Sequence, residues 1–257
     1  LAAIDDLHEN RVDNAQANLM AMMSLSKGLQ HEPLLISQLV RMAMIQISFN
    51  TFWGALHHPG FREPHLAAWQ QAWSAPEFLR DFQPALQMEI SYSENIYRMA
   101  RTNPASLFGG PFSPSSSGQG FQAELREKLH MHLLWPYWES YRDEYRELFR
   151  IQSGLATVRQ GLAGQPWKLA LHDYYSAVSS LQSDQPSTST PLWWLDDSDS
   201  IRSCLQKIGA AETVQHMMVC AIALQRYKLR HGRFPDGLSQ LAPDFLPAVS
   251  MDFMDGQ

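Results

Sequence analysis

The sequence predicts an all-α fold, either a multi-helix bundle or an irregular helical array, that ends in a short turn-rich C-terminal tail. Three observations lead to this prediction. Apolar residues recur at intervals of three and four along most of the 257-residue chain, which is the spacing of one helix face. The alternation of apolar and polar residues that marks a half-buried strand is scarce. Pro33 and Gly232 stand where helices are expected to begin and end.

The chain divides into three helical regions and two loops, which we expect to form one compact domain overall. The N-terminal and middle helical regions span 1–102 and 121–181, and a C-terminal helix with its tail spans 201–257. One loop, 103–120, is rich in glycine, proline and serine. The other, 182–200, is rich in serine, threonine and aspartate and has no lysine or arginine. Such compositions are typical of loops.

A helix predicted at 34–56 has apolar residues on two faces. It follows a helix at 13–29 and begins after Pro33, because a proline is tolerated in the first turn. Its first face carries Leu35, Leu39, Met42, Ile45, Phe49 and Phe52, and its second carries Ile36, Val40, Met44 and Ile47. A helix with two apolar faces is usually the buried centre of a bundle, and we expect that role here. Its only charged residue, Arg41, then needs a carboxylate partner or a route to solvent.

The remaining periodic segments predict further helices at 64–73, 76–101, 121–151, 166–181 and 201–231. Pro136 is expected to kink or split the helix that contains it, since it lacks the backbone N–H. The last helix ends in Arg230 and His231 before Gly232, which are cations in the last turn and a glycine cap. The residues that follow, Leu238, Leu241, Phe245 and Leu246, are predicted to fold back on this helix.

Composition and charge exclude several classes of protein. The chain has 20 Lys and Arg against 26 Asp and Glu, a net charge of −6, and lacks the basic stripe of a nucleic-acid binder. No run of 18 apolar residues occurs, so no spanning helix is predicted within this sequence. Cys204 and Cys220 fall in one predicted helix, about 24 Å apart, which is too far for a disulfide.

The sequence contains none of the common catalytic motifs, so no cofactor is predicted and a non-enzymatic role is favoured. Two weak metal-binding patterns remain. Glu127 and His130 form a Glu-x-x-His pair on a predicted helix, which is half of the pattern used by di-metal helix bundles, but no second pair occurs. His57, His58 and His65 cluster around a Pro-Gly turn and could share a zinc ion. Solvated side chains are the alternative interpretation of both.

The eight tryptophans suggest a different kind of site. Trp193 and Trp194 lie within the acidic loop, and a pair of loop tryptophans either docks on the core or contacts a ligand or partner. Five other tryptophans fall at helical positions and are therefore expected in the core: Trp53, Trp69, Trp73, Trp135 and Trp138. An exposed subset could form a stacking platform for a sugar or peptide.

The C-terminal segment 221–257 contains Ala-Leu-Gln-Arg-Tyr followed by His-Gly-Arg-Phe-Pro and a Leu-x-x-Leu stretch. It resembles the C-terminal signature, written ERYRxxHGRFP/DPFDGQ, of uncharacterised membrane-anchored extracytoplasmic bacterial helical proteins. The segment 32–43 is similar to their N-terminal region, and the C-terminal segment is weakly similar to pseudopilins. At 250–255, both prolines that are usual in this part of the signature are replaced by other residues. The resemblance implies an extracytoplasmic protein on the periplasmic side, anchored through a membrane segment upstream of Leu1, and it implies no reaction.

These observations together predict a non-catalytic extracytoplasmic scaffold or interaction subunit with another protein as its partner. The first alternative is a ligand-binding module that takes a sugar or peptide through exposed tryptophans. The second alternative is a metal-dependent helical enzyme centred on Glu127 and His130.

Overall fold

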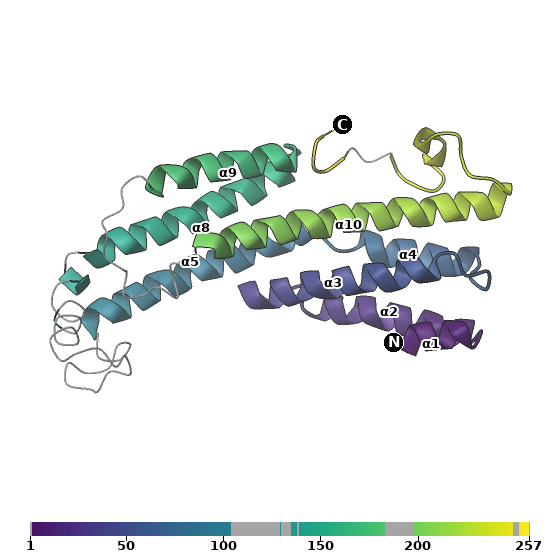
Figure 1. The fold of residues 1–257 in the computed structure, drawn as a ribbon, viewed down its shortest axis with the longest axis horizontal. Helices are drawn as coiled ribbons and strands as arrows, with labels where there is room; N and C mark the ends of the chain where they lie inside the picture. The colour runs from purple at the N-terminus through teal and green to yellow at the C-terminus, as the bar shows by residue number, and fades with distance from the viewer. Residues whose placement is uncertain are drawn as a thin grey trace, which may run out of the picture. The chain divides into compact units, whose positions relative to one another are not determined.

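The computed structural model describes residues 2–103, 129, 135–137, 139–182, 198–248 and 252–256. This part of the chain contains eight α-helices, one short 3-10 helix and no strand, so the all-α prediction is confirmed. The α-helices are α1 (Ala2–His8), α2 (Val12–Gly28), α3 (Leu35–Ala55), α4 (Glu63–Ser74), α5 (Phe78–Thr102), α8 (Ser140–Leu162), α9 (Trp167–Gln182) and α10 (Ser198–His231) (Figure 1). The 3-10 helix is η2 (Leu238–Leu241). None of these helices is long and apolar enough to cross a membrane.

The chain forms two compact units. Unit 1 consists of residues 1–85, 158–171 and 204–257, and unit 2 consists of residues 86–157 and 172–203. Unit 1 therefore contains α1 to α4 and most of α10, whereas unit 2 contains most of α5, α8 and α9.

The first three helices of unit 1 lie side by side, with α1 against both α2 and α3 (Figure 1). Asp6 joins α1 to α2, because its carboxylate accepts hydrogen bonds from Arg11 Nε, just before α2, and from Asn18 Nδ2 in α2, each at 2.8 Å. The apolar core forms where α3 meets α4. Phe52 packs edge-on against Trp69 and Trp73, with ring centroids 5.0 and 5.5 Å apart.

One of the two apolar faces of α3 is buried and the other is exposed. Met42, Ile45 and Phe52 belong to the core, as predicted. The prediction that α3 is the buried centre of a bundle is wrong, because Ile36 is 65% exposed and Ile47 is 61% exposed. Helical periodicity shows that a face is apolar, but it does not show that another part of the same chain packs against it.

Two other predictions need correction. Trp53, expected in the core, is 43% exposed and stacks on Phe49 at the end of α3. The helix expected to end at Ile151 continues in α8 to Leu162. Leu155 and Val158 continue the buried face of Ile151 at helical spacing, but polar neighbours conceal this pattern in the sequence. Trp69, Trp73 and Trp135 are buried as predicted, and Trp138 is outside the described residues.

The C-terminal tail packs on α10, as the sequence predicts for most of its apolar residues. Leu241, Phe245 and Leu246 form a buried cluster with Ala223, whereas Leu238 is exposed. Arg226 fixes this arrangement. Its guanidinium donates to Glu63 at 2.9 Å and to Gln70 Oε1 at 2.8 Å, and Gln70 Nε2 in turn donates to the carbonyl of Phe245 at 2.6 Å.

Residues 252–256 pack against the first turn of α9, far from them in sequence. The backbone N–H groups of Trp167 and Lys168 donate to the carbonyls of Phe253 and Met254 at 3.0 and 3.1 Å. The rings of Trp167 and Phe253 stack with centroids 5.5 Å apart. The Trp167 indole also lies against α10, where a Cβ added to Gly209 would clash with its Nε1. Only glycine therefore fits at position 209.

In unit 2, the start of α8 is joined to α5 through a buried tryptophan. Pro136, predicted to interrupt the helix, lies in a π-helical turn just before α8. Trp135 Nε1 donates to Asp143 Oδ2 at 2.8 Å, and its ring packs beside Tyr97 with centroids 6.2 Å apart. Burial raises the pKa of Asp143, and the hydrogen bond from Trp135 partly opposes this shift. Cys204 and Cys220 are not joined by a disulfide, as their predicted separation requires.

Candidate functional site

Several of the residues proposed from the sequence are outside the described part of the chain. These are Glu127, His130, Trp193 and Trp194, so the metal pair and the tryptophan pair stay predictions.

The three histidines of the Pro-Gly turn lie in the connection between α3 and α4. His58 Nδ1 accepts a hydrogen bond from the N–H of Gly60, and His65 Nδ1 accepts one from the N–H of Arg62, each at 3.2 Å. The ring of Phe61 lies beside both imidazoles, and His57 packs beside Trp53. Within the described ranges, no three His, Cys, Asp or Glu residues are placed to hold a metal ion. The zinc interpretation of this cluster therefore has no geometric support.

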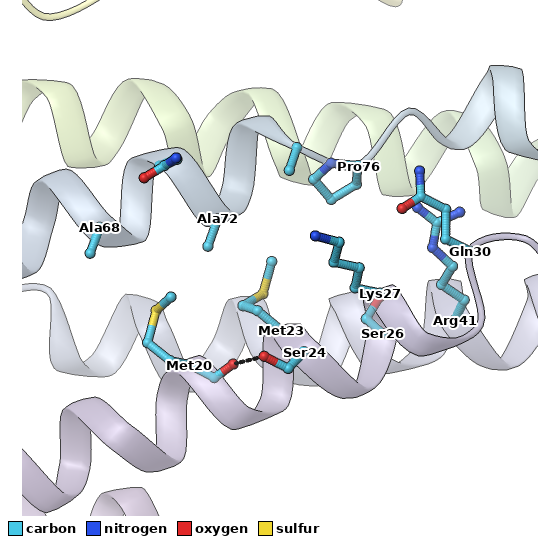
Figure 2. Close-up of a pocket in the computed structure, with 12 residues that line it drawn as sticks. Met20, Met23, Ser24, Ser26, Lys27, Gln30, Arg41, Ala68, Ala72 and Pro76 are labelled. Carbon is cyan, nitrogen blue, oxygen red and sulfur yellow. Dashed lines mark hydrogen bonds between the residues drawn. The ribbon is translucent and has the colours of Figure 1, made fainter.

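Unit 1 has a groove between α2 and α4, with a volume of about 300 Å³. Its walls are mostly apolar and are formed by Met20, Met23, Ala68, Ala72, Ala75 and Pro76. Figure 2 shows Met23 and Lys27 extending from α2 toward Ala72 and Pro76 on the opposite wall. Gln30 and Arg41 lie at the polar end of the groove, near Lys27 (Figure 2).

The arrangement of side chains on α4 explains why a groove forms here. This helix turns Trp69 and Trp73 into the core, where both are fully buried. Trp69 Nε1 also donates to Gln16 Oε1 of α2. Ala68, Ala72 and Ala75 recur on the side that faces the groove. Alanine is too short to fill the space between two helices, so the Met20 and Met23 side chains lie against an open wall.

The two cations at the polar end of the groove differ in their availability to a ligand. Arg41 is 1% exposed and forms an ion pair with Asp81, with 2.7 Å between Nη1 and Oδ2. It also donates to Gln38 Oε1 at 3.2 Å and lies over the ring of Phe78. The carboxylate partner that the sequence requires for Arg41 is thus Asp81. Lys27 is exposed and forms no ion pair with any described residue, so it is the cation that a ligand can reach.

A second buried acid, Glu212 of α10, lies close to this ion pair. Its Oε1 accepts a hydrogen bond from the N–H of Leu79 at 3.0 Å. Burial raises the pKa of Glu212 because the charged carboxylate loses its hydration, while the Leu79 N–H and the charge of Arg41 oppose the shift. Folding therefore shifts the equilibrium of this carboxyl toward its neutral form relative to the unfolded chain.

We expect Glu212 to make the protein less stable as the pH rises. Because its folded-state pKa is raised, the stabilisation is complete below the pKa of the unfolded chain and is lost as the pH rises through the folded-state value. Glu212→Gln keeps an acceptor for Leu79 but cannot ionise. The urea midpoint of the natural protein should fall relative to that of Glu212→Gln as the pH rises above about 4.3, the ordinary pKa of glutamate. Glu94→Gln, at an exposed site, is the control, and parallel pH profiles for Glu212→Gln would contradict this assignment.

Unit 2 presents a row of exposed tyrosines beside a polar pocket. Tyr137, Tyr141 and Tyr145 recur every four residues and are at least 60% exposed. The guanidinium of Arg101 lies 4.2 Å from the ring centroid of Tyr141 and pairs with Glu144 at 2.7 Å. Arg101 and Glu144 also line a pocket of about 300 Å³. Among the described residues of this unit, these tyrosines form an exposed aromatic surface, which the sequence did not predict.

The α2–α4 groove was also not predicted from the sequence, although the sequence contains one signal for it. Ala68, Ala72 and Ala75 recur at intervals of four and three on a helix whose other face carries two tryptophans. Such a helix must bury the tryptophan side, and its alanine side can then form only a shallow wall.

Comparisons with protein-family models, with curated proteins and with solved structures found no match to this chain.

Proposed function

We propose that this protein is a non-catalytic interaction subunit that binds an amphipathic helix of another protein in the α2–α4 groove. The observation that supports this proposal best is the combination of methionine and alanine walls with an exposed lysine at one end that pairs with no described residue.

The walls suit a helix because they combine an adaptable side with a flat one. Met20 and Met23 have flexible, polarizable side chains, which favour contacts with apolar surfaces of different shapes. Ala68 and Ala72 allow a partner backbone to approach closely. A volume of about 300 Å³ is at the lower end of ligand pockets, so it takes a few apolar side chains projecting from one helix face. This is the geometry of helix-in-groove recognition, with anchors at intervals of three and four.

The charge at the polar end specifies the partner further. Lys27 is available whereas Arg41 is already paired with Asp81, and the chain as a whole has a net charge of −6. A helix with an acidic residue at one end of its apolar face would place that residue beside Lys27. Exposed charge pairs of this kind contribute mainly to orientation and specificity. The C-terminal resemblance supports an extracytoplasmic setting for this interaction.

A designed peptide pair tests the proposal. Both peptides have about 18 residues, long enough to form a helix, and carry leucines at helical spacing. One ends its apolar face in glutamate and the other in lysine. We expect fluorescence anisotropy to show that the glutamate peptide binds more tightly. Lys27→Glu should weaken the binding of the glutamate peptide by about three- to tenfold and strengthen the binding of the lysine peptide. The reason is that each charge reversal changes one partly exposed ion pair.

Filling the groove tests the apolar contacts separately. Ala72→Phe should reduce binding of both peptides by at least tenfold, whereas Ala21→Phe, at an exposed position of α2 away from the groove, should leave it unchanged. Circular dichroism checks that both variants remain folded. Failure of both peptides to bind, or equal binding to Ala72→Phe and Ala21→Phe, would contradict the proposal.

A further inference from the structure

The exposed face of α3 carries a regular stripe of residues that we name the α3 seam. It consists of Ile36, Val40, Ala43, Ile47, Asn50 and Gly54, all of them exposed. Their intervals are four, three, four, three and four, which is the repeat of a helix that packs lengthwise against a second helix. The only charged residue of α3, Arg41, is buried on the opposite side, so the seam presents no charge to a partner.

The order of large and small residues along the seam is self-complementary. When two copies of α3 are placed antiparallel about a twofold axis between Ala43 and Ile47, each large residue faces a smaller one. Ile36 faces Gly54, Val40 faces Asn50, and Ile47 faces Ala43. In a parallel arrangement each residue would face itself, so the Ala43 and Gly54 levels would be underfilled while the isoleucine levels would be crowded. Close packing therefore favours the antiparallel pair.

A pocket at the end of the seam supports the same arrangement. It has a volume of about 260 Å³ and lies between α1 and the last turns of α3, where Ile4, Leu7, Asn50 and Gly54 contribute to its lining. A Cβ added to Gly54 would meet nothing within 4 Å. In the antiparallel pair, Ile36 of a second copy reaches this level, and its side chain is 65% exposed in the single chain. The twofold axis makes both contacts at once, so the interface closes on itself.

From these observations we infer that two copies of this chain associate through antiparallel packing of their α3 seams, with Ile36 of each copy inserted beside Gly54 of the other. The seam brings no like charges into contact, but the net charge of −6 on each copy opposes association. The strip from Ile36 to Gly54 is about 27 Å long and about 10 Å wide, or on the order of 300 Å², which is less than the roughly 800 Å² per partner of a standard interface. We therefore expect a weak dimer that forms only at micromolar or higher protein concentrations.

Sedimentation velocity between about 1 and 200 µM tests the association, because this range brackets a micromolar dissociation constant. The natural protein is expected to pass from monomer to dimer. Ile47→Glu and Gly54→Leu are expected to stay monomeric throughout, since one introduces facing charges and the other fills the pocket. Leu25→Glu and Gly28→Leu are the matched controls, because Leu25 is as exposed as Ile36 and Gly28 is as open as Gly54.

Cross-linking tests the orientation. In a background with Cys204→Ala and Cys220→Ser, a mixture of Ala43→Cys and Ile47→Cys proteins is expected to form a disulfide-linked heterodimer, while each protein alone does not. A natural protein that stays monomeric, or a dimer that Ile47→Glu leaves intact, overturns the inference. Cross-linking of each single variant with itself overturns the antiparallel arrangement. The groove experiment concerns a different surface, so the two results are independent.

Discussion

Replacing Arg41 with methionine should lower the free energy of unfolding by about 3–5 kcal/mol, the usual effect of removing one partner of a buried ion pair. Arg41 is 1% exposed, and its guanidinium lies 2.7 Å from the carboxylate of Asp81. Its charge also opposes the raised pKa of Glu212. The variant therefore leaves Asp81 buried without its cation and Glu212 harder to ionise. Urea unfolding followed by circular dichroism measures the change.

Arg80, the residue next to Asp81 in α5, supplies the control for the effect of Arg41→Met. Arg80 pairs with Glu77 at 2.8 Å, but both side chains are at least half exposed, so Arg80→Met should change the stability by less than about 1 kcal/mol. Adding Asp81→Leu and Glu212→Gln to Arg41→Met should restore much of the lost stability, because no buried charge then lacks a partner. Equal effects of Arg41→Met and Arg80→Met would show that the buried pair is not the cause.

Replacing Trp167 with alanine should cost a similar amount, about 3–5 kcal/mol. The side chain is fully buried, stacks on Phe253 and lies against the glycine surfaces of α8 and α10. Neither Gly161 nor Gly209 has a side chain that could move into the space left by the indole. The cavity would therefore remain open, and the docking of residues 252–256 would lose its main apolar contact. Differential scanning calorimetry measures the stability, and limited proteolysis measures the release of the C-terminal segment.

Trp53→Ala is the matched control for this second variant. Trp53 is 43% exposed, so the same chemical change removes much less buried surface and leaves no enclosed cavity, and it should cost clearly less than Trp167→Ala. If Trp167→Ala lowers the free energy of unfolding by no more than Trp53→Ala does, the packing of Trp167 between Gly161 and Gly209 does not determine the stability of unit 1.

The helices that could be predicted from the sequence are those with an unbroken apolar period. The predicted helix at 34–56 corresponds to α3, and the one at 201–231 corresponds closely to α10, because their apolar residues and end signals agree. The extension of α8 beyond Ile151 was missed since Gln152, Ser153 and Gly154 interrupt the pattern. The short α1 was also missed, because seven residues are too few to show a period.

The candidate surfaces were harder to predict because they depend on what surrounds each helix. The sequence shows that Ile36 and Ile47 form a second apolar face, but only the structure shows that this face is exposed. The sequence predicts that a buried Arg41 needs a carboxylate partner. It does not predict that this partner is Asp81, because that depends on where α5 begins. The groove depends on the separation of α2 and α4, which no local pattern specifies.

The assembly of unit 1 from three separated stretches of chain has a consequence for its biosynthesis. Gln70 of α4 bonds to the carbonyl of Phe245, 175 residues later, and Trp167 needs Phe253 to cover it. At 5–20 residues per second, a ribosome needs roughly 10 to 30 s to synthesise the chain between the first pair. During that time α1 to α4 are present without the C-terminal residues that complete their packing. Unit 1 therefore finishes folding only after the residues up to Phe253 have left the ribosome, and a chaperone that shields apolar helices during this interval would raise its yield.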